Sequence, residues 1–166
     1  MQLVVGLGNP GPKYANTRHN IGVMALDELL DRHSATLSVH KRTNTEIAEV
    51  SGAVFARTRE YINLSGGPVK ALMNYFRPDG LIVLHDELDY DFGVVKERTS
   101  GDHGHNGLRS ITKAVGPDYV RVALGIGRPP GRMEPAAFVL KTFSKAESVE
   151  LPIMCADAAD VVEKHF

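Results

Sequence analysis

The sequence predicts an α/β protein: a single three-layer domain in which a mixed, mostly parallel sheet is flanked by helices. Short apolar runs typical of buried strands alternate with longer segments whose apolar residues recur at helical spacing. The chain of 166 residues is long enough for one hydrophobic core and short for two. Its content of 43% hydrophobic and 23% charged residues is ordinary for a globular domain, so one domain over residues 1–166 is expected.

The first 58 residues contain four expected elements. Residues 2–6 form a run of leucine and valine closed by a glycine, as in a buried strand. In residues 20–32 apolar side chains recur every three or four positions with acidic ones between them, which predicts an amphipathic helix. Residues 46–50 and 53–58 are predicted to be strands joined by a Ser-Gly turn.

The alternation of strands and helices continues from residue 68 onward. Residues 68–76 predict a helix, since they begin with a proline, which suits a first helical turn. Residues 81–84 form the most apolar strand candidate, and residues 93–98 are a further one. Residues 106–115 predict a helix that ends at a glycine followed by a proline, and residues 120–125 predict another strand.

The last part of the chain combines a loop rich in proline and glycine, residues 127–135, with a mostly helical segment, residues 144–164. Cys155 lies among apolar residues of that segment and is expected to be a buried packing residue. As the only cysteine it excludes an intrachain disulfide, which favours a reducing, cytoplasmic compartment. No apolar run has the length of a membrane span, and no secretory signal pattern precedes the first strand.

The segment Gly6-Leu7-Gly8-Asn9-Pro10-Gly11 has the G-x-G-x-x-G spacing of a dinucleotide-binding loop. In such a loop a helix begins at the third glycine, so that its first amides hold the pyrophosphate. Here a polar connection follows Gly11, and the helical pattern begins only near His19. The loop is therefore better interpreted as displaying Asn9 and Tyr14 ahead of His19. The N-terminus of the following helix should keep this imidazole neutral and able to accept a proton.

Polar residues stand at the ends of the other predicted elements. Asp86 follows the strongest strand and is either a solvated residue, a metal ligand or a carboxylate that orients a histidine. Asn63 stands at a strand-to-helix turn, and Asn106 at a helix start, where asparagine is a favoured cap. An α/β topology can gather these ends with His19 at one sheet edge. A carboxylate on one imidazole nitrogen raises the basicity of the other, and the absence of a G-x-S-x-G motif favours water as the nucleophile.

These residues carry a family resemblance. In order from Leu3 to about Lys141, the sequence resembles the bacterial-type peptidyl-tRNA hydrolases. That family hydrolyses the ester between a peptide and the 3′ end of tRNA, and its members are α/β monomers without a metal. The matching motifs are Gly6-Leu7-Gly8-Asn9-Pro10-Gly11, Tyr14, Thr17-Arg18-His19-Asn20, Asn63-Leu64-Ser65-Gly66, His85-Asp86-Glu87-Leu88-Asp89, Gly104-His105-Asn106-Gly107-Leu108 and Gly125-Ile126-Gly127-Arg128-Pro129.

The resemblance implies a role for each matching residue. His19 would be the general base, Asp86 the carboxylate that stabilises its reactive form, and Asn9 a residue that places the water. The residues expected to bind the peptide or the 3′ end are Tyr14, Tyr61, Asn63 and Asn106. Candidates for contacts with tRNA phosphates are Lys96, Arg98, Lys113 and Arg128. The resemblance implies a monomeric protein that has peptidyl-tRNA as its partner. It implies neither a cofactor nor a metal.

Three departures from the family pattern concern the tRNA contacts. Ala123 stands where many members have an arginine, the loop 99–103 is short, and the chain ends at Phe166, before a helical tail common in the family. With the formal net charge of −1, they leave open a non-catalytic relative that binds tRNA or peptide.

A metal-dependent hydrolase is the other open alternative. Zinc would require three protein ligands and a water, and the sequence offers His103-x-His105 and His85-Asp86 near the acidic residues Glu87, Asp89 and Asp102. The H-E-x-x-H pattern of many zinc hydrolases is absent from the sequence.

Overall fold

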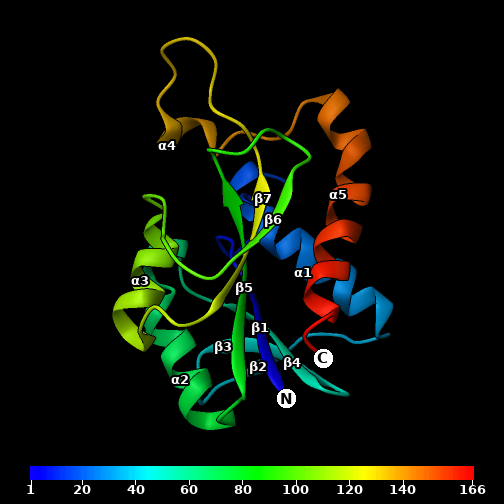
Figure 1. Ribbon diagram of the computed structural model, residues 1–166, viewed down its shortest axis with the longest axis vertical. Coiled ribbons are helices and arrows are strands. Elements are labelled where there is room, and N and C mark those ends of the chain that lie inside the picture. Colours follow the sequence, from blue (N-terminus) through cyan, green and yellow to red (C-terminus); the bar gives the residue numbers. More distant parts are fainter.

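A mixed sheet of seven strands forms the centre of the computed structural model, which describes residues 1–166 (Figure 1). The strand order is β2-β3-β4-β1-β5-β7-β6. The strands are β1 (Gln2–Gly6), β2 (Ser38–His40), β3 (Thr45–Val50), β4 (Ala53–Thr58), β5 (Gly80–Glu87), β6 (Val95–Arg98) and β7 (Val120–Gly125). The helices are α1 (Ile21–Arg32), α2 (Gly66–Phe76), α3 (Asn106–Val115), α4 (Pro135–Phe138) and α5 (Lys145–Glu163), with 3₁₀ turns η1 (Arg18–Asn20) and η2 (Ile62–Leu64).

The sheet is parallel in its middle and antiparallel at both sides. Strands β4, β1, β5 and β7 run in parallel, whereas β2, β3 and β6 are paired antiparallel with their neighbours. The carboxyl ends of β1, β5 and β7 therefore meet at one edge of the sheet, where α/β proteins build their sites. The predicted fold class, α/β with a mixed sheet, is confirmed.

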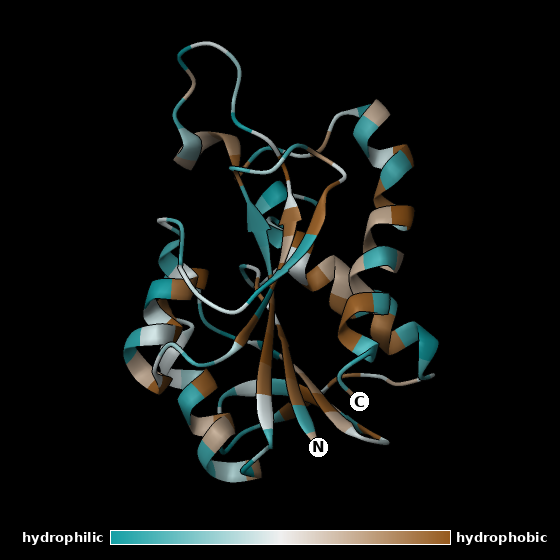
Figure 2. Cartoon of the chain, viewed as in Figure 1, coloured by the Kyte–Doolittle hydropathy of each residue, from teal (hydrophilic) through white to brown (hydrophobic).

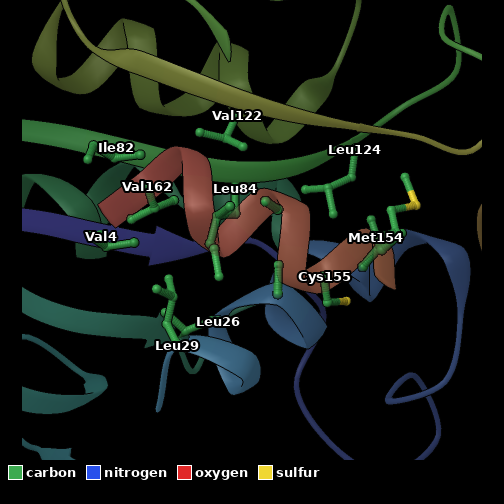
Figure 3. Packing of buried hydrophobic residues seen from close by; sticks show 14 of the residues in the cluster. Val4, Leu26, Leu29, Ile82, Leu84, Val122, Leu124, Met154, Cys155 and Val162 are labelled. Atoms are coloured by element: carbon green, nitrogen blue, oxygen red, sulfur yellow. The ribbon is translucent and has the colours of Figure 1, made fainter. Parts of the chain in front are cut away.

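Helices cover both faces of the sheet. Helices α1 and α5 lie on one face, and α2 and α3 lie on the other (Figure 1). The strands are apolar through the middle of the molecule, as Figure 2 shows. Alternate residues of β1 serve the two cores, with Val4 in the α1–α5 core and Leu3 and Val5 in the α2–α3 core. Cys155 is buried in the first of these cores (Figure 3), which confirms its expected packing role.

Two glycines allow α1 to lie unusually close to the strands. A Cβ atom on Gly22 would stand 2.3 Å from the Leu84 carbonyl oxygen, and one on Gly6 would stand 2.7 Å from the Gly22 carbonyl oxygen. Only residues without side chains permit this approach. The start of α1 is thereby held against the carboxyl ends of β1 and β5.

The structure adds to and corrects the expected elements. Strand β2 and helix α4 were not predicted, because each has only three or four residues. Strand β5 continues to Glu87, so Asp86 lies in the strand and not in a loop after it. None of the helices combines the length and the apolarity that a membrane crossing requires.

Candidate active site

A cavity of about 480 Å³ opens at the carboxyl edge of the sheet. Its walls come from the loop after β1, from η1, η2, the end of β5, the start of α3, and α4. The predicted site residues that line it are Asn9, His19, Tyr61, Asn63, Asp86 and Asn106. The fold therefore brings together side chains that are up to 97 positions apart, from Asn9 to Asn106.

His19 and Asp86 are in direct contact. The Nδ1 atom of His19 lies 2.8 Å from Oδ2 of Asp86. His19 stands in the middle of η1, immediately before α1, and Asp86 projects from β5 with a side chain that is 3% exposed. A carboxylate only accepts hydrogen bonds, so Nδ1 carries the proton. The other ring nitrogen, Nε2, is thus left with its lone pair, as a general base requires.

A second histidine, His105, also donates to Asp86. Its Nε2 atom lies 2.7 Å from Oδ1 of Asp86. Its Nδ1 atom accepts from the backbone amides of Gly107, at 3.1 Å, and Leu108, at 3.3 Å. These contacts require a neutral ring with the proton on Nε2. His105 is therefore the N-cap of α3, and the assignment of Asn106 to that position was wrong.

The two histidines determine the charge on Asp86. Burial alone would raise the pKa of this carboxyl group, but the hydrogen bonds that it accepts from His19 and His105, and the positive charge of His19 when that ring is protonated, hold the pKa far below its usual range. Burial alone would lower the pKa of His19, and the Asp86 carboxylate outweighs this and raises it above 6.5. A helix N-terminus alone would lower the pKa of His19, but the adjacent carboxylate dominates and shifts it in the opposite direction.

A third histidine, His85, is fully buried beside this group. Its Nδ1 atom donates to the backbone carbonyl of Asp86 at 2.8 Å, and its Nε2 atom has no partner. Burial, together with the nearby His105, lowers the pKa of His85 to about 3. This ring is neutral at pH 7 and packs behind the site.

Asn9 is fixed at the cavity by three hydrogen bonds. Its side-chain Oδ1 accepts from the amide of Ile62 at 2.8 Å. Its backbone N–H and C=O are paired with the side-chain amide of Asn20, both at 2.9 Å. Because Oδ1 is occupied, the Nδ2 amide group of Asn9 remains free to donate into the cavity. Asn20 follows His19 directly, so these bonds also tie the first loop to η1.

The residues expected to bind substrate stand around the rim. Asn63 lies in η2 and Asn106 begins α3, and both are exposed. Tyr61 is 53% exposed and meets the ring of Tyr14 edge to face, with ring centroids 6.0 Å apart. Tyr14 itself is not part of the cavity lining. The rim thus presents side-chain amides beside an aromatic pair in which Tyr61 is exposed and Tyr14 is half-buried.

One part of the cavity wall is apolar and comes from Pro135, the last residue of the predicted loop, and from residues 136–140, for which no element was predicted. Its lining residues are Pro135, Ala136, Val139 and Leu140, of helix α4 and the residues after it. This wall is attached to η1, because the backbone amide of His19 donates to the carbonyl of Val139 at 2.8 Å.

Two of the four basic candidates are engaged within the protein. The guanidinium of Arg98 donates to the carbonyls of Ser100 and Gly101 and contacts Nε2 of His103 at 2.6 Å. Its side chain is only 12% exposed, so its donors hold the loop 99–103 in place. Arg128 is exposed but forms an ion pair with Asp89.

The other two basic candidates, Lys96 and Lys113, are exposed. The Lys96 ammonium lies 5.2 Å from the centre of the Tyr90 ring, next to the Arg128–Asp89 pair. Lys113 lies on α3. Ala123 is fully buried in β7, directly opposite Lys96 in the sheet register.

Two groups of side chains have donor atoms close enough to share a metal ion. They are His19 with Asp86 and His105, and His103 with Glu87 and Asp89. In the first group both ring nitrogens that face Asp86 carry protons, so their lone pairs are not available there. In the second group His103 donates to Glu87 at 2.8 Å, and Arg98 and Arg128 already accompany the two carboxylates. The donor sets match hydrogen-bond networks better than metal ligation.

The G-x-G-x-x-G segment also fits the structure without a dinucleotide. No helix begins at Gly11, and residues 11–16 are turns and bends ahead of η1. The pyrophosphate position of a dinucleotide site, at the first amides of a helix, is therefore not formed there. Gly6 of this segment instead takes part in the close packing of α1 described above, whereas a Cβ atom on Gly11 would meet no atom within 4 Å.

Comparison with known proteins identifies the family of this chain. The family model described as peptidyl-tRNA hydrolase matches residues 3–166. A peptidyl-tRNA hydrolase of Corynebacterium efficiens is 58% identical over 99% of this chain and 95% of the relative, and one of Frankia alni is 52% identical over 97% and 85%. The crystal structure of peptidyl-tRNA hydrolase from Acinetobacter baumannii superposes with a TM-score of 0.90 at 32% identity, covering 98% of this chain and 87% of that one. The chain therefore belongs to the peptidyl-tRNA hydrolase family.

Proposed function

We propose that this protein hydrolyses the ester bond between the peptide and the tRNA of peptidyl-tRNA and so releases free tRNA. The observation that carries the proposal is the His19–Asp86 contact, with the free Nε2 side of His19 at a cavity that is also lined by three asparagines. A positioned base and amide donors suffice for ester hydrolysis by water.

The reaction begins with a water molecule at Nε2 of His19. His19 takes a proton from this water as its oxygen attacks the ester carbonyl carbon. Asp86 holds Nδ1 and stabilises the imidazolium that forms, as the carboxylate of a catalytic triad does. The free Nδ2 of Asn9 donates to the water or to the carbonyl oxygen. The tetrahedral intermediate then loses the ribose oxygen, which receives the proton from His19. The peptide leaves as a carboxylic acid, which releases its remaining proton to solvent and becomes a carboxylate.

Substrate recognition is divided between the two sides of the cavity. The amides of Asn63 and Asn106 both donate and accept, which suits the backbone of a peptide. Tyr14 and Tyr61 offer a surface on which a base or a side chain can stack. Lys96, Lys113 and Arg128 are exposed and provide the contacts with tRNA phosphates, whereas Arg98 holds the loop 99–103.

The oligomeric state, the compartment and the cofactor requirement of the reaction are also part of this proposal. We expect the protein to act as a monomer in the cytoplasm, where peptidyl-tRNA arises, and to need neither a metal nor a cofactor. With a net charge of −1, its affinity for tRNA must come from local clusters of basic residues, and this part of the affinity falls as salt rises.

A discharge assay tests the function. N-acetyl-aminoacyl-tRNA and free aminoacyl-tRNA are incubated separately with the protein, and release of the amino acid is followed in single turnovers. We expect rapid discharge of the N-blocked substrate only. His19→Ala should lower the rate about 10²–10⁴-fold, the usual range for loss of a general base. His33→Ala, at the opposite end of α1, is the matched control and should leave the rate unchanged.

Three results would contradict the proposal. Binding of the N-blocked substrate without turnover would identify a non-catalytic relative. Complete loss of activity after chelation, with recovery on adding zinc, would identify a metal-dependent hydrolase. A decrease of less than tenfold in folded His19→Ala would mean that His19 is not the base.

A further inference from the structure

Arg18 precedes the proposed base in the chain, and its side chain is directed away from the cavity. It opens the turn η1, yet it is 8% exposed, which is unusual for an arginine. His19, its neighbour in the same turn, lines the cavity, whereas Arg18 does not. The two residues of one turn thus have different surroundings.

The guanidinium of Arg18 joins η1 to the segment between α4 and α5. It donates from Nη1 to the carbonyl of Thr142 at 3.0 Å and from Nη2 to Oε1 of Glu147 at 2.8 Å. Its planar group also lies 4.2 Å from the centre of the Phe138 ring and 5.5 Å from that of Phe143. A lysine offers neither the planar fork nor the flat face that these contacts use.

Glu147 is itself part of a local structure. Its Oε1 also accepts from the amide of Ser144, whose hydroxyl accepts in return from the amide of Glu147. This reciprocal pair is the capping box that begins α5. Arg18 is therefore connected to the start of α5 as well as to the end of α4.

The backbone repeats the same connection. The amide of Arg18 donates to the carbonyl of Lys141 at 3.0 Å, and that of His19 donates to the carbonyl of Val139 at 2.8 Å. Val139 and Leu140 form part of the apolar cavity wall. The turn that carries the base and the apolar wall beside it are thus joined by two backbone hydrogen bonds and one arginine.

The energetic cost of burying Arg18 indicates that this residue has a geometric role. A buried ion pair is weak evidence for stability, because desolvation offsets the attraction. Arg18 also leaves its Nε buried without a partner, which costs further free energy. Its presence is better explained by the position that it imposes on the two segments than by its contribution to folding.

We propose that Arg18 is a positioning residue that holds residues 138–142, and with them Val139 and Leu140 of the apolar wall, in a fixed relation to His19. This inference rests on the proposed hydrolysis. A substrate held between this wall and the base is attacked productively only within a narrow range of positions, so a loosened wall slows the chemical step. Most of the tRNA is remote from this wall, and its binding does not depend on Arg18.

The test compares Arg18→Met with two control variants. In Arg18→Met we expect kcat to fall about 10- to 100-fold while KM changes less than threefold. Arg32→Met also removes an arginine that joins α1 to α5, through Asp160, but at the far end of α1. Ser144→Ala weakens the start of α5 without removing Arg18. Both controls should lose stability and keep kcat, with the folded fraction measured at the assay temperature.

Hydrogen exchange supplies a local readout that a loss of global stability does not produce. The amides of residues 18 and 19, which donate to the wall segment, should exchange at least tenfold faster in Arg18→Met and remain protected in Arg32→Met. If Arg18→Met does not fold, Arg18→Lys decides the question, with an expected intermediate loss of kcat. The wild-type discharge rate tests the proposed function separately. An active wild type whose kcat is matched within twofold by folded Arg18→Met or Arg18→Lys would overturn the positioning role.

Discussion

Replacing Asp86 by asparagine tests the hydrogen-bond network at the centre of the site. Asp86 accepts from both His19 and His105, whereas asparagine has one accepting oxygen and one donating amide group. The backbone amides of Gly107 and Leu108 fix His105 as a donor at Nε2. The oxygen of the new asparagine must therefore face His105, and its amide group must face His19.

This orientation has a consequence for the base. With an N–H group opposite its Nδ1, His19 must move its proton to Nε2, and the nitrogen that faces the water is no longer basic. The same tautomer change in Ser-His-Asp triads lowers kcat about 10⁴-fold. We expect a decrease of about 10³–10⁴-fold in kcat, equivalent to about 4–5.5 kcal/mol of activation free energy, with little change in KM.

The assay is single-turnover discharge of N-acetyl-aminoacyl-tRNA, with ¹⁵N chemical shifts of the imidazoles to report their tautomers. In the double variant Asp86→Asn/His105→Asn, the second asparagine can still cap α3 but is too short to reach position 86. The asparagine at position 86 is then free to turn its oxygen toward His19, and about a tenfold recovery of kcat over Asp86→Asn is expected. A weakened KM with unchanged kcat in Asp86→Asn, or a double variant slower than the single one, would refute this reasoning.

Three further predictions follow from the same region. The pKa of His85 is about 3 in the folded protein and 6.5 when the side chain is exposed. Below pH 6.5 the unfolded chain therefore binds a proton that the folded chain does not. This lowers the free energy of unfolding by about 1.4 kcal/mol for each pH unit. Urea unfolding between pH 7 and 5 measures this slope, which should be smaller in His85→Gln; an equal slope would contradict it. Because Asp86 raises the pKa of His19 and the base must be neutral, kcat/KM should decline on the acid side with a midpoint above 6.5; a midpoint below 6 would assign that limb to another group. Gly22→Ala places a Cβ atom 2.3 Å from the Leu84 carbonyl oxygen and should cost about 1–3 kcal/mol in unfolding free energy together with a loss of kcat, and a variant as stable and active as the wild type would show that α1 need not lie so close.

The main elements were predictable because each has a local signal. The apolar periodicity of α1 and the unbroken apolar run of β5 identify a helix and a strand without reference to the rest of the chain. Strand β2 has only three residues, two of them exposed, and α4 has four. Such short elements are stabilised by their tertiary contacts, which a local sequence pattern does not predict.

The sequence predicted which residues form the site better than it predicted how they contact one another. Strand ends in an α/β sheet converge, so His19 and Asp86 were expected at one edge, and the structure places them 2.8 Å apart. The role of His105 was missed because Asn106 beside it is the more favoured capping residue. The choice between them depends on Asp86, 19 positions earlier in the chain and on another element.

The opening glycines show how one spacing can serve two purposes. In a dinucleotide loop the glycines let the backbone approach a phosphate, and here Gly6 and Gly22 let a helix approach two strands. Both uses require a missing Cβ atom after a buried strand, so the local pattern alone does not distinguish them. The distinction lies in where the helix begins, which here is at Ile21 and not at Gly11. Because the helix begins late, the ten residues from Gly11 to Asn20 are available to form the turn that carries His19, and close packing of α1 then holds that turn against the end of β5, where Asp86 projects.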